Sequence, residues 1–178
     1  GYFSSDFIVG IYSLASSITE GISQIHYIFR NLYNPLITRM HFFKSKSLFK
    51  RVVDKAVIFN YKLFFFVWII SSSVLALILY FLFNEYEIYM IFISFLILNT
   101  GLFFASGYIP FQMIFNQTGH PNIQTIYTTL ICFSNIILNI ILINSIGLYG
   151  AAIATAVTFI LQSLYLKVLA KRILNLKI

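Results

Sequence analysis

Apolar residues in this chain come in five long runs that are separated by short polar or charged segments. Each run is near or above the roughly 20 residues that a helix needs to cross a bilayer. None alternates apolar and polar positions as the strands of a membrane barrel do. The pattern therefore predicts an all-α integral membrane protein with about five transmembrane helices. These helices are expected over residues 7–34, 57–83, 89–115, 122–144 and 147–170.

The segments between the runs differ in composition. Residues 38–55, "TRMHFFKSKSLFKRVVDK", mix basic side chains with Phe and Val. That mixture predicts an interfacial helix on the membrane surface, in which residues 42–55 contact anionic lipid headgroups. Residues 84–87 form a short acidic turn, and residues 116–122 contain the helix breakers Gly and Pro.

Composition supports a membrane location. The chain is 60% hydrophobic and only 10% charged, whereas soluble domains carry about 25% charged residues. Of the 12 Lys and Arg residues, seven lie between Arg39 and Lys62 and four between Lys167 and Lys177. Basic groups at the ends of apolar runs orient a protein in a membrane and do not indicate nucleic-acid binding. Residues 38–55 are therefore expected inside, which places the N-terminus outside and the C-terminus in the cytoplasm.

No pattern in the sequence predicts an enzyme. His41 and His120 have no carboxylate or Cys partner at a useful spacing, so we find no catalytic set of residues and no cofactor motif. The single cysteine, Cys132, excludes an intrachain disulfide and a cysteine metal site. The chain opens at Gly1, and an odd number of spans beginning outside leads us to expect further helices upstream.

The first apolar run carries a polar stripe. Wound at about 100° per residue, the run places Ser13, Ser16, Ser17, Glu20, Gln24, Tyr27, Asn31 and Asn34 on one face. Arg30 lies at the edge of that face and His26 lies further round, while Pro35 is expected to end the helix. An ionised group in hydrocarbon costs several kcal/mol, so the stripe should face other helices or water.

The charges of the stripe are not expected to pair with each other. Glu20 and Arg30 are separated by about 15 Å of helical rise, so one straight helix cannot join them as an ion pair. A functional role for at least one of them is therefore favoured over a structural ion pair.

Three later helices carry milder polar faces. Such groups either bond between helices or line a wet cavity, and we favour interhelical bonding for Asn135, Asn139, Thr155 and Thr158. Pro110 should kink the third helix because it removes a backbone hydrogen bond. The three faces are Asn99, Ser106, Pro110 and Gln117; Thr128, Cys132, Asn135 and Asn139; and Ala151, Thr155, Thr158 and Gln162.

Three strings carry a family resemblance: "DFIVGIYSLASSI" (6–18), "NLYNPLITRM" (31–40) and "NIILNIILINSIGLYGAAIATAV" (135–157). In this order they resemble the C-terminal half of polysaccharide flippases, including O-antigen flippases, of the multidrug/oligosaccharidyl-lipid/polysaccharide exporter superfamily. The resemblance implies helices 8 to 12 of a MATE-like transporter, in which two bundles flank a central cavity. The chain would then be a partial C-terminal bundle, residues 1–178, and its partner would be a missing N-terminal bundle.

The resemblance further implies a function. Such a protein flips undecaprenyl-pyrophosphate-linked oligosaccharide across the bacterial cytoplasmic (inner) membrane by alternating access, for O-antigen, lipopolysaccharide or other surface polysaccharide assembly. The stripe, and no matched family motif, then suggests roles: Arg30 for phosphate and Glu20 for a coupling ion. The candidate sugar contacts are Gln24, Tyr27, Asn31 and Asn34.

Two alternatives stay open. A cation-coupled multidrug antiporter of the same superfamily would use Glu20, although the nearby Arg30 suits an anionic cargo better. A non-transporting membrane scaffold would need neither residue. A membrane polymerase or glycosyltransferase is disfavoured, because the expected outside loops are only a few residues long.

Overall fold

The computed structural model describes residues 6–42, 46–82 and 85–174. This part of the chain contains helices and no strand, which confirms the all-α prediction. The elements are α1 (Asp6–Phe42), α2 (Lys46–Leu82), α3 (Glu85–Ala105), the 3-10 helix η1 (Ile109–Phe111), α4 (Ile114–Gln117), α5 (Pro121–Ile146) and α6 (Leu148–Ile173).

Three of the described helices are long and apolar enough to cross a membrane. They contain the stretches Leu48–Phe81, Pro121–Ile146 and Leu148–Ile173, and α3 with η1 and α4 makes a fourth if this bent pair is one span. These helices support a membrane-embedded protein. α1 is not among them, although it has 37 residues, because its polar stripe lowers its apolar content.

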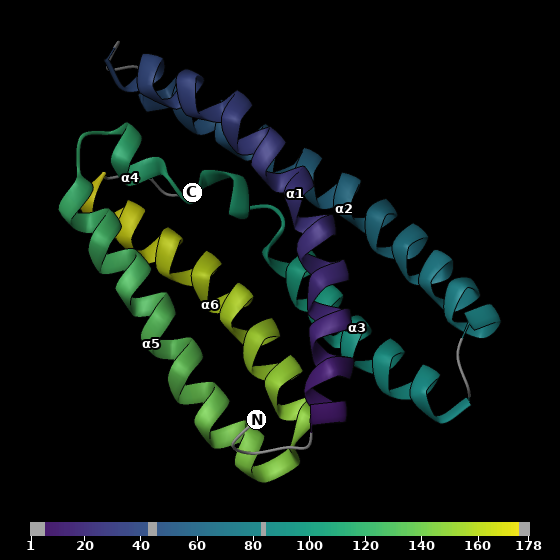
Figure 1. Ribbon diagram of the computed structural model, residues 1–178. Helices are drawn as coiled ribbons and strands as arrows, with labels where there is room; N and C mark the ends of the chain where they lie inside the picture. The colour runs from purple at the N-terminus through teal and green to yellow at the C-terminus, as the bar shows by residue number, and fades with distance from the viewer. Residues whose placement is uncertain (1–5, 43–45, 83–84, 175–178) are drawn as a thin grey trace.

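The α5–α6 hairpin lies on one side of the molecule and α2 lies on the other, and α3 with η1 and α4 runs between them (Figure 1). The second half of α1 lies beside the first half of α2, whereas the first half of α1 crosses α3. Gly147 joins α5 to α6 with φ of 61°. Only glycine adopts this conformation at little cost, so the turn depends on it.

Small residues bring α6 close to its neighbours. Ala152 and Ala154 are fully buried. A Cβ atom at Gly101 of α3 would lie 2.5 Å from the Cα atom of Ala156, and one at Gly150 would meet the carbonyl group of Leu142 in α5. Close approach of this kind is how helices associate where lipid removes the hydrophobic driving force.

The third predicted span is broken. α3 ends at Ala105, and the chain continues through η1 and α4 at an angle of 59°. Pro110 has no N–H, and its ring excludes the carbonyl group four residues earlier, that of Ser106. The chain therefore turns with short-range bonds, such as the one from the Phe111 N–H to the Tyr108 oxygen at 2.9 Å. The kink is confirmed, but a single helix over 89–115 is wrong.

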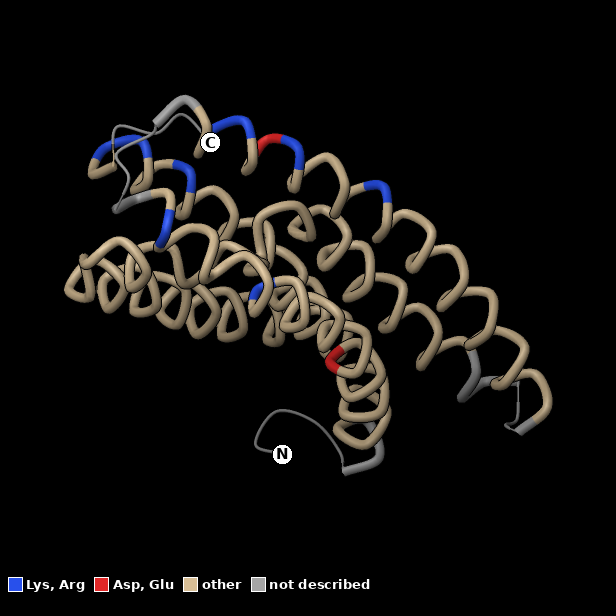
Figure 2. The backbone as a smooth tube through the Cα atoms, turned by 90° about the horizontal axis from the view of Figure 1, so that it is seen from above, with Lys and Arg blue, Asp and Glu red and all other residues tan. Residues whose placement is uncertain are grey.

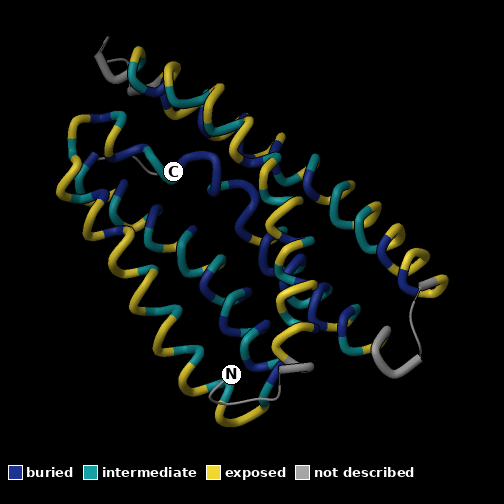
Figure 3. The backbone as a smooth tube through the Cα atoms, viewed as in Figure 1, coloured by how far each residue is buried: buried dark blue, intermediate teal, exposed yellow. Residues whose placement is uncertain are grey.

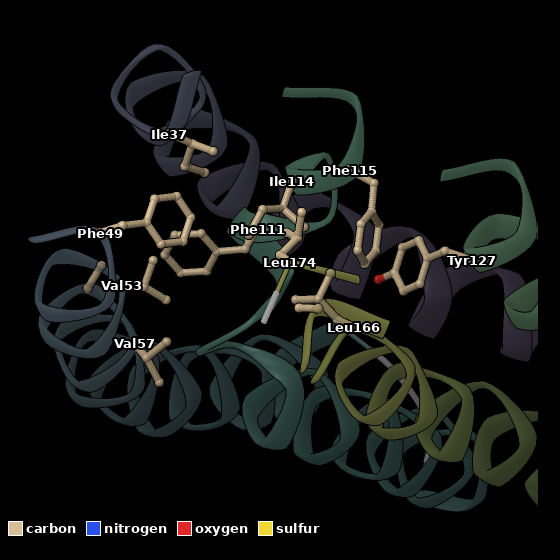
Figure 4. Close-up of a cluster of buried hydrophobic side chains, with 12 residues drawn as sticks. Ile37, Phe49, Val53, Val57, Phe111, Ile114, Phe115, Tyr127, Leu166 and Leu174 are labelled. Atoms are coloured by element: carbon tan, nitrogen blue, oxygen red, sulfur yellow. The ribbon is translucent and has the colours of Figure 1, made fainter. Parts of the chain in front are cut away.

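The break places three apolar side chains in the main core. Phe111, Ile114 and Phe115 are fully buried and meet residues from α1, α2, α5 and α6 (Figure 4). Each fully buried side chain of this size contributes about 1.5–3 kcal/mol when the alternative is water. The short elements η1 and α4 therefore form the centre of the packing. Their partners include Ile37, Phe49, Val53, Val57, Tyr127, Leu166 and Leu174.

Two boundary predictions are wrong. α1 continues through Pro35 to Phe42. Pro35 removes one backbone hydrogen bond, but the burial of Ile37 in the core outweighs that loss. Residues 38–55 do not form a separate interfacial helix: 38–42 end α1, and 46–55 begin α2. The face of α2 that carries Phe49 and Val53 packs in the core, which keeps this segment helical.

Basic residues gather at one end of the molecule (Figure 2). Lys50, Arg51 and Lys55 of α2 lie on its exposed side, and Lys171 and Arg172 end α6. A helix of 37 residues, such as α2, is about 55 Å long, while the hydrocarbon core is about 30 Å thick. The helical turns that carry these basic residues can thus project beyond the hydrocarbon core of the bilayer.

A matched pair of substitutions tests the close α3–α6 contact. Gly101→Ala should lower the free energy of unfolding by about 1–3 kcal/mol, because the added methyl group overpacks against Ala156. Gly21→Ala in α1 meets nothing within 4 Å and should be neutral or stabilising. Detergent unfolding followed by the fluorescence of Trp68, the single tryptophan, measures both. Equal changes in the free energy of unfolding of the two variants would contradict the close contact between α3 and α6 at Gly101.

Candidate functional site

α1 has a buried face and an exposed face (Figure 3). One face packs against the other helices and is buried at Ile11, Ala15, Thr19, His26 and Ile37. These residues are spaced by about one or more helical turns, so they share one side of the helix. The opposite side carries the polar stripe, and the described helices do not cover it.

The predicted site residues all lie on or beside this uncovered side. Glu20, Gln24, Tyr27 and Asn31 are exposed, and Arg30 and Asn34 are half-buried. From Glu20 to Asn34 the stripe extends over about 21 Å of helix, a large part of a ~30 Å hydrocarbon core. The structure therefore presents these groups as one continuous polar surface.

Arg30 interacts with Tyr27, one turn earlier. The guanidinium carbon lies 4.3 Å from the centre of the Tyr27 ring, a cation–π contact that holds the charge against the helix. The Glu20 backbone oxygen accepts a hydrogen bond from Ser23 Oγ at 2.7 Å. Within the described chain Glu20 and Arg30 are not paired with each other, as their separation along α1 predicts.

The end of the stripe at Asn34 adjoins the broken span. Thr38 Oγ1 lies 3.1 Å from the Asn34 backbone oxygen and donates a hydrogen bond to Gln117 Oε1 of α4 at 2.6 Å. The side-chain oxygen of Asn34 is buried and has no hydrogen-bond partner among the described residues. This link couples the position of α1 to that of α4.

His26 is not part of the stripe. Its ring stacks on Phe64 of α2, with 3.7 Å between ring centres, and only 1% of the residue is exposed. The imidazole therefore fixes α1 against α2.

Polar groups on the later helices are used mainly between helices. Asn135 donates to Thr158 at 3.2 Å, Asn139 donates to the Asn135 side-chain oxygen at 3.0 Å, and the Tyr12 hydroxyl group bonds Thr155 at 3.0 Å. Interhelical bonding is therefore confirmed for Asn135, Thr155 and Thr158. It is wrong for Asn139, which bonds to Asn135 within α5. Asn99 likewise donates to Ser71 Oγ at 3.0 Å. The polar faces of α3, α5 and α6 are therefore not gathered with the stripe into one cavity.

The described residues offer no metal site. They contain no group of three or more His, Cys, Asp or Glu residues that could hold an ion. Cys132 is exposed on α5.

Sequence reasoning missed a second surface, between α3 and α6. Both helices line an apolar groove here. About 10 Å beyond its Ile160 end along α6, Lys167 Nζ lies 4.1 Å from the centre of the Tyr108 ring. The signal in the sequence was the spacing of Ile153, Ile160 and Lys167, which seven-residue steps place on one face of a helix. By composition alone, Lys167 belongs with the other basic residues near the C-terminal end of the sequence.

The chain matches no protein-family model, no curated protein and no solved structure. Functional inference therefore depends on the residues of this chain and their geometry.

Cysteine accessibility tests whether the stripe borders water. In a Cys132→Ser background and a native membrane, Asn31→Cys should react with a membrane-impermeant maleimide about tenfold or more faster than Leu32→Cys. The reason is that the reactive thiolate is costly to form in hydrocarbon. Leu32 is the matched control, because it is adjacent, 59% exposed and about 100° round the helix. Equal labelling rates would place the stripe against lipid or protein.

Proposed function

We propose that this chain forms one wall of the substrate passage in a flippase for undecaprenyl-pyrophosphate-linked oligosaccharide. The observation that carries the proposal is the uncovered polar face of α1, in a chain whose other long helices expose mainly apolar side chains. Charged and amide groups at membrane depth are costly unless they line water, substrate or protein. A second helix bundle on the other side of the passage would complete it, in a MATE-like arrangement.

The chemistry of the stripe fits such a cargo. A diphosphate needs a cation, and a sugar needs amides and hydroxyl groups. The Arg30 guanidinium would contact phosphate, and its contact with Tyr27 would orient it for that role. Gln24, Asn31 and Asn34 would contact sugar hydroxyl groups, while Glu20 would bind the coupling ion. The lipid tail would remain in the bilayer.

The broken span supports transport by alternating access. Discontinuous helices in transporters lie beside the substrate site and allow one part of a bundle to move against another. Here the break is followed by α4, which is tied to the end of the stripe at Asn34 through Gln117 and Thr38. Movement of α4 would therefore change the stripe where substrate enters.

The basic end gives the orientation of the proposed transporter. Arg39, Lys50, Arg51, Lys171 and Arg172 would lie at the cytoplasmic face, following the positive-inside rule. Of these, Lys50 and Arg51 would contact anionic headgroups there. The C-terminus would then be cytoplasmic and the membrane would be the bacterial inner membrane. Cargo would move from the cytoplasmic to the outer leaflet.

Substitutions on the stripe test this function in the complete polypeptide. Arg30→Leu should reduce surface polysaccharide by about tenfold or more, because one charge-assisted contact to phosphate is worth about 1.5–3 kcal/mol. Glu20→Gln should reduce it similarly if the carboxylate binds the coupling ion. Arg172→Leu, at the exposed end of α6, is the matched control and should preserve assembly. Polysaccharide at the cell surface and protein abundance in the membrane are measured together.

The outcomes separate the alternatives. A scaffold would support normal polysaccharide assembly with both substitutions. A multidrug antiporter would lose drug resistance with Glu20→Gln and tolerate Arg30→Leu. The present chain alone should not flip lipid-linked sugar in vesicles, because a single wall does not enclose a passage.

A further inference from the structure

An apolar groove of about 360 Å³ runs between α3 and α6. Its walls include Thr100, Gly101 and Phe104 from α3, and Ile153, Val157 and Ile160 from α6. Thr100 is the polar residue of this lining, and its Oγ1 accepts a hydrogen bond from Trp68 Nε1 of α2 at 3.2 Å. The groove consequently presents hydrocarbon to whatever fills it.

The groove leads to a cation. Lys167 follows Ile160 by seven residues, so it lies on the same face of α6, about 10 Å closer to the basic end. Its ammonium group rests over the Tyr108 ring in the break after α3. Lys171, one turn further, is exposed. From Ile153 to Lys167 the surface extends over about 21 Å, comparable with the ~15 Å depth of one leaflet of hydrocarbon.

We propose that this surface binds an anionic phospholipid. One acyl chain lies in the groove between α3 and α6, and the phosphate group lies at Lys167 and Lys171. Charge complementarity identifies the occupant. The groove is lined by apolar residues and Thr100, and Lys167 lies beyond its Ile160 end on the same face of α6. An apolar surface followed by a cation fits an anionic lipid better than a helix from another protein. Lys167 would reach the headgroup along its own aliphatic stem.

This lipid site is separate from the polar stripe. α3 turns Phe95, Leu98 and Leu102 towards α1, whereas Thr100 and Phe104 line the groove on the other side of the helix. Lipid binding at this surface does not depend on transport, because it needs only a membrane with the basic end of the protein at its surface.

Trp68 provides the experiment, since it is the single tryptophan and bonds a groove residue. The protein is reconstituted in phosphatidylcholine vesicles that contain a minor fraction of lipid brominated midway along its chains. Bromine quenches tryptophan on contact. Brominated phosphatidylglycerol should compete for the site about fivefold more tightly than brominated phosphatidylcholine.

Matched variants locate the headgroup and the chain. Lys167→Gln should abolish the preference for phosphatidylglycerol, whereas Arg172→Gln, at the same end of α6 but about 140° round the helix, should preserve it. Val157→Phe should fill the groove and reduce quenching by either brominated lipid. Ile137→Phe, on the exposed side of α5, should leave quenching unchanged. Circular dichroism checks that each variant is folded.

Four results would overturn the proposal. One is a preference that survives Lys167→Gln, and another is its equal loss in Arg172→Gln, which would indicate general surface charge. The third is quenching that falls as the ratio of protein to lipid rises, which would show that a second copy of the chain occupies the groove. Unchanged quenching in folded Val157→Phe would equally exclude the groove as the place of the acyl chain.

Discussion

Backbone N–H and C=O groups in an apolar environment must all find hydrogen-bond partners. This requirement is most demanding at the break after α3, where the regular helical bonds end. Each unsatisfied N–H or C=O group in hydrocarbon costs several kcal/mol. The Tyr61 hydroxyl group donates to the Phe104 oxygen at 3.0 Å, and Ser163 Oγ donates to the Ala105 oxygen at 3.4 Å. Side chains from α2 and α6 therefore complete the end of α3, and the break is possible only because those helices surround it.

Several features depend on this break. It turns Phe111 and Ile114 into the core, carries Tyr108 to Lys167, and brings Gln117 to Thr38 of α1. A straight third helix would make none of these contacts. The break also requires glycine at position 107, because a Cβ atom there would collide with the ring of Tyr61.

Polar side chains in this chain divide into two groups. Those of α3, α5 and α6 mostly bond to a neighbouring helix or to their own backbone, as Asn99 and Asn135 do, and such bonds hold helices together where lipid competes for apolar surface. Those on the outer side of α1, including Glu20 and Asn31, have no helix against them in the described chain. The proposed transport function depends on the second group, and the stability of the bundle depends on the first.

Local composition and the helical period were enough to predict the helical class, the apolar stretches, the basic end and the stripe on α1. Pro110 could be predicted as a kink, since the missing N–H is a property of the residue. Packing between distant segments makes α1 continue past Pro35, makes residues 46–55 extend α2 and turns His26 to Phe64. It also creates the groove between α3 and α6. These features depend on burial and contacts between residues far apart in the chain, and no local pattern encodes which partner a side chain will meet.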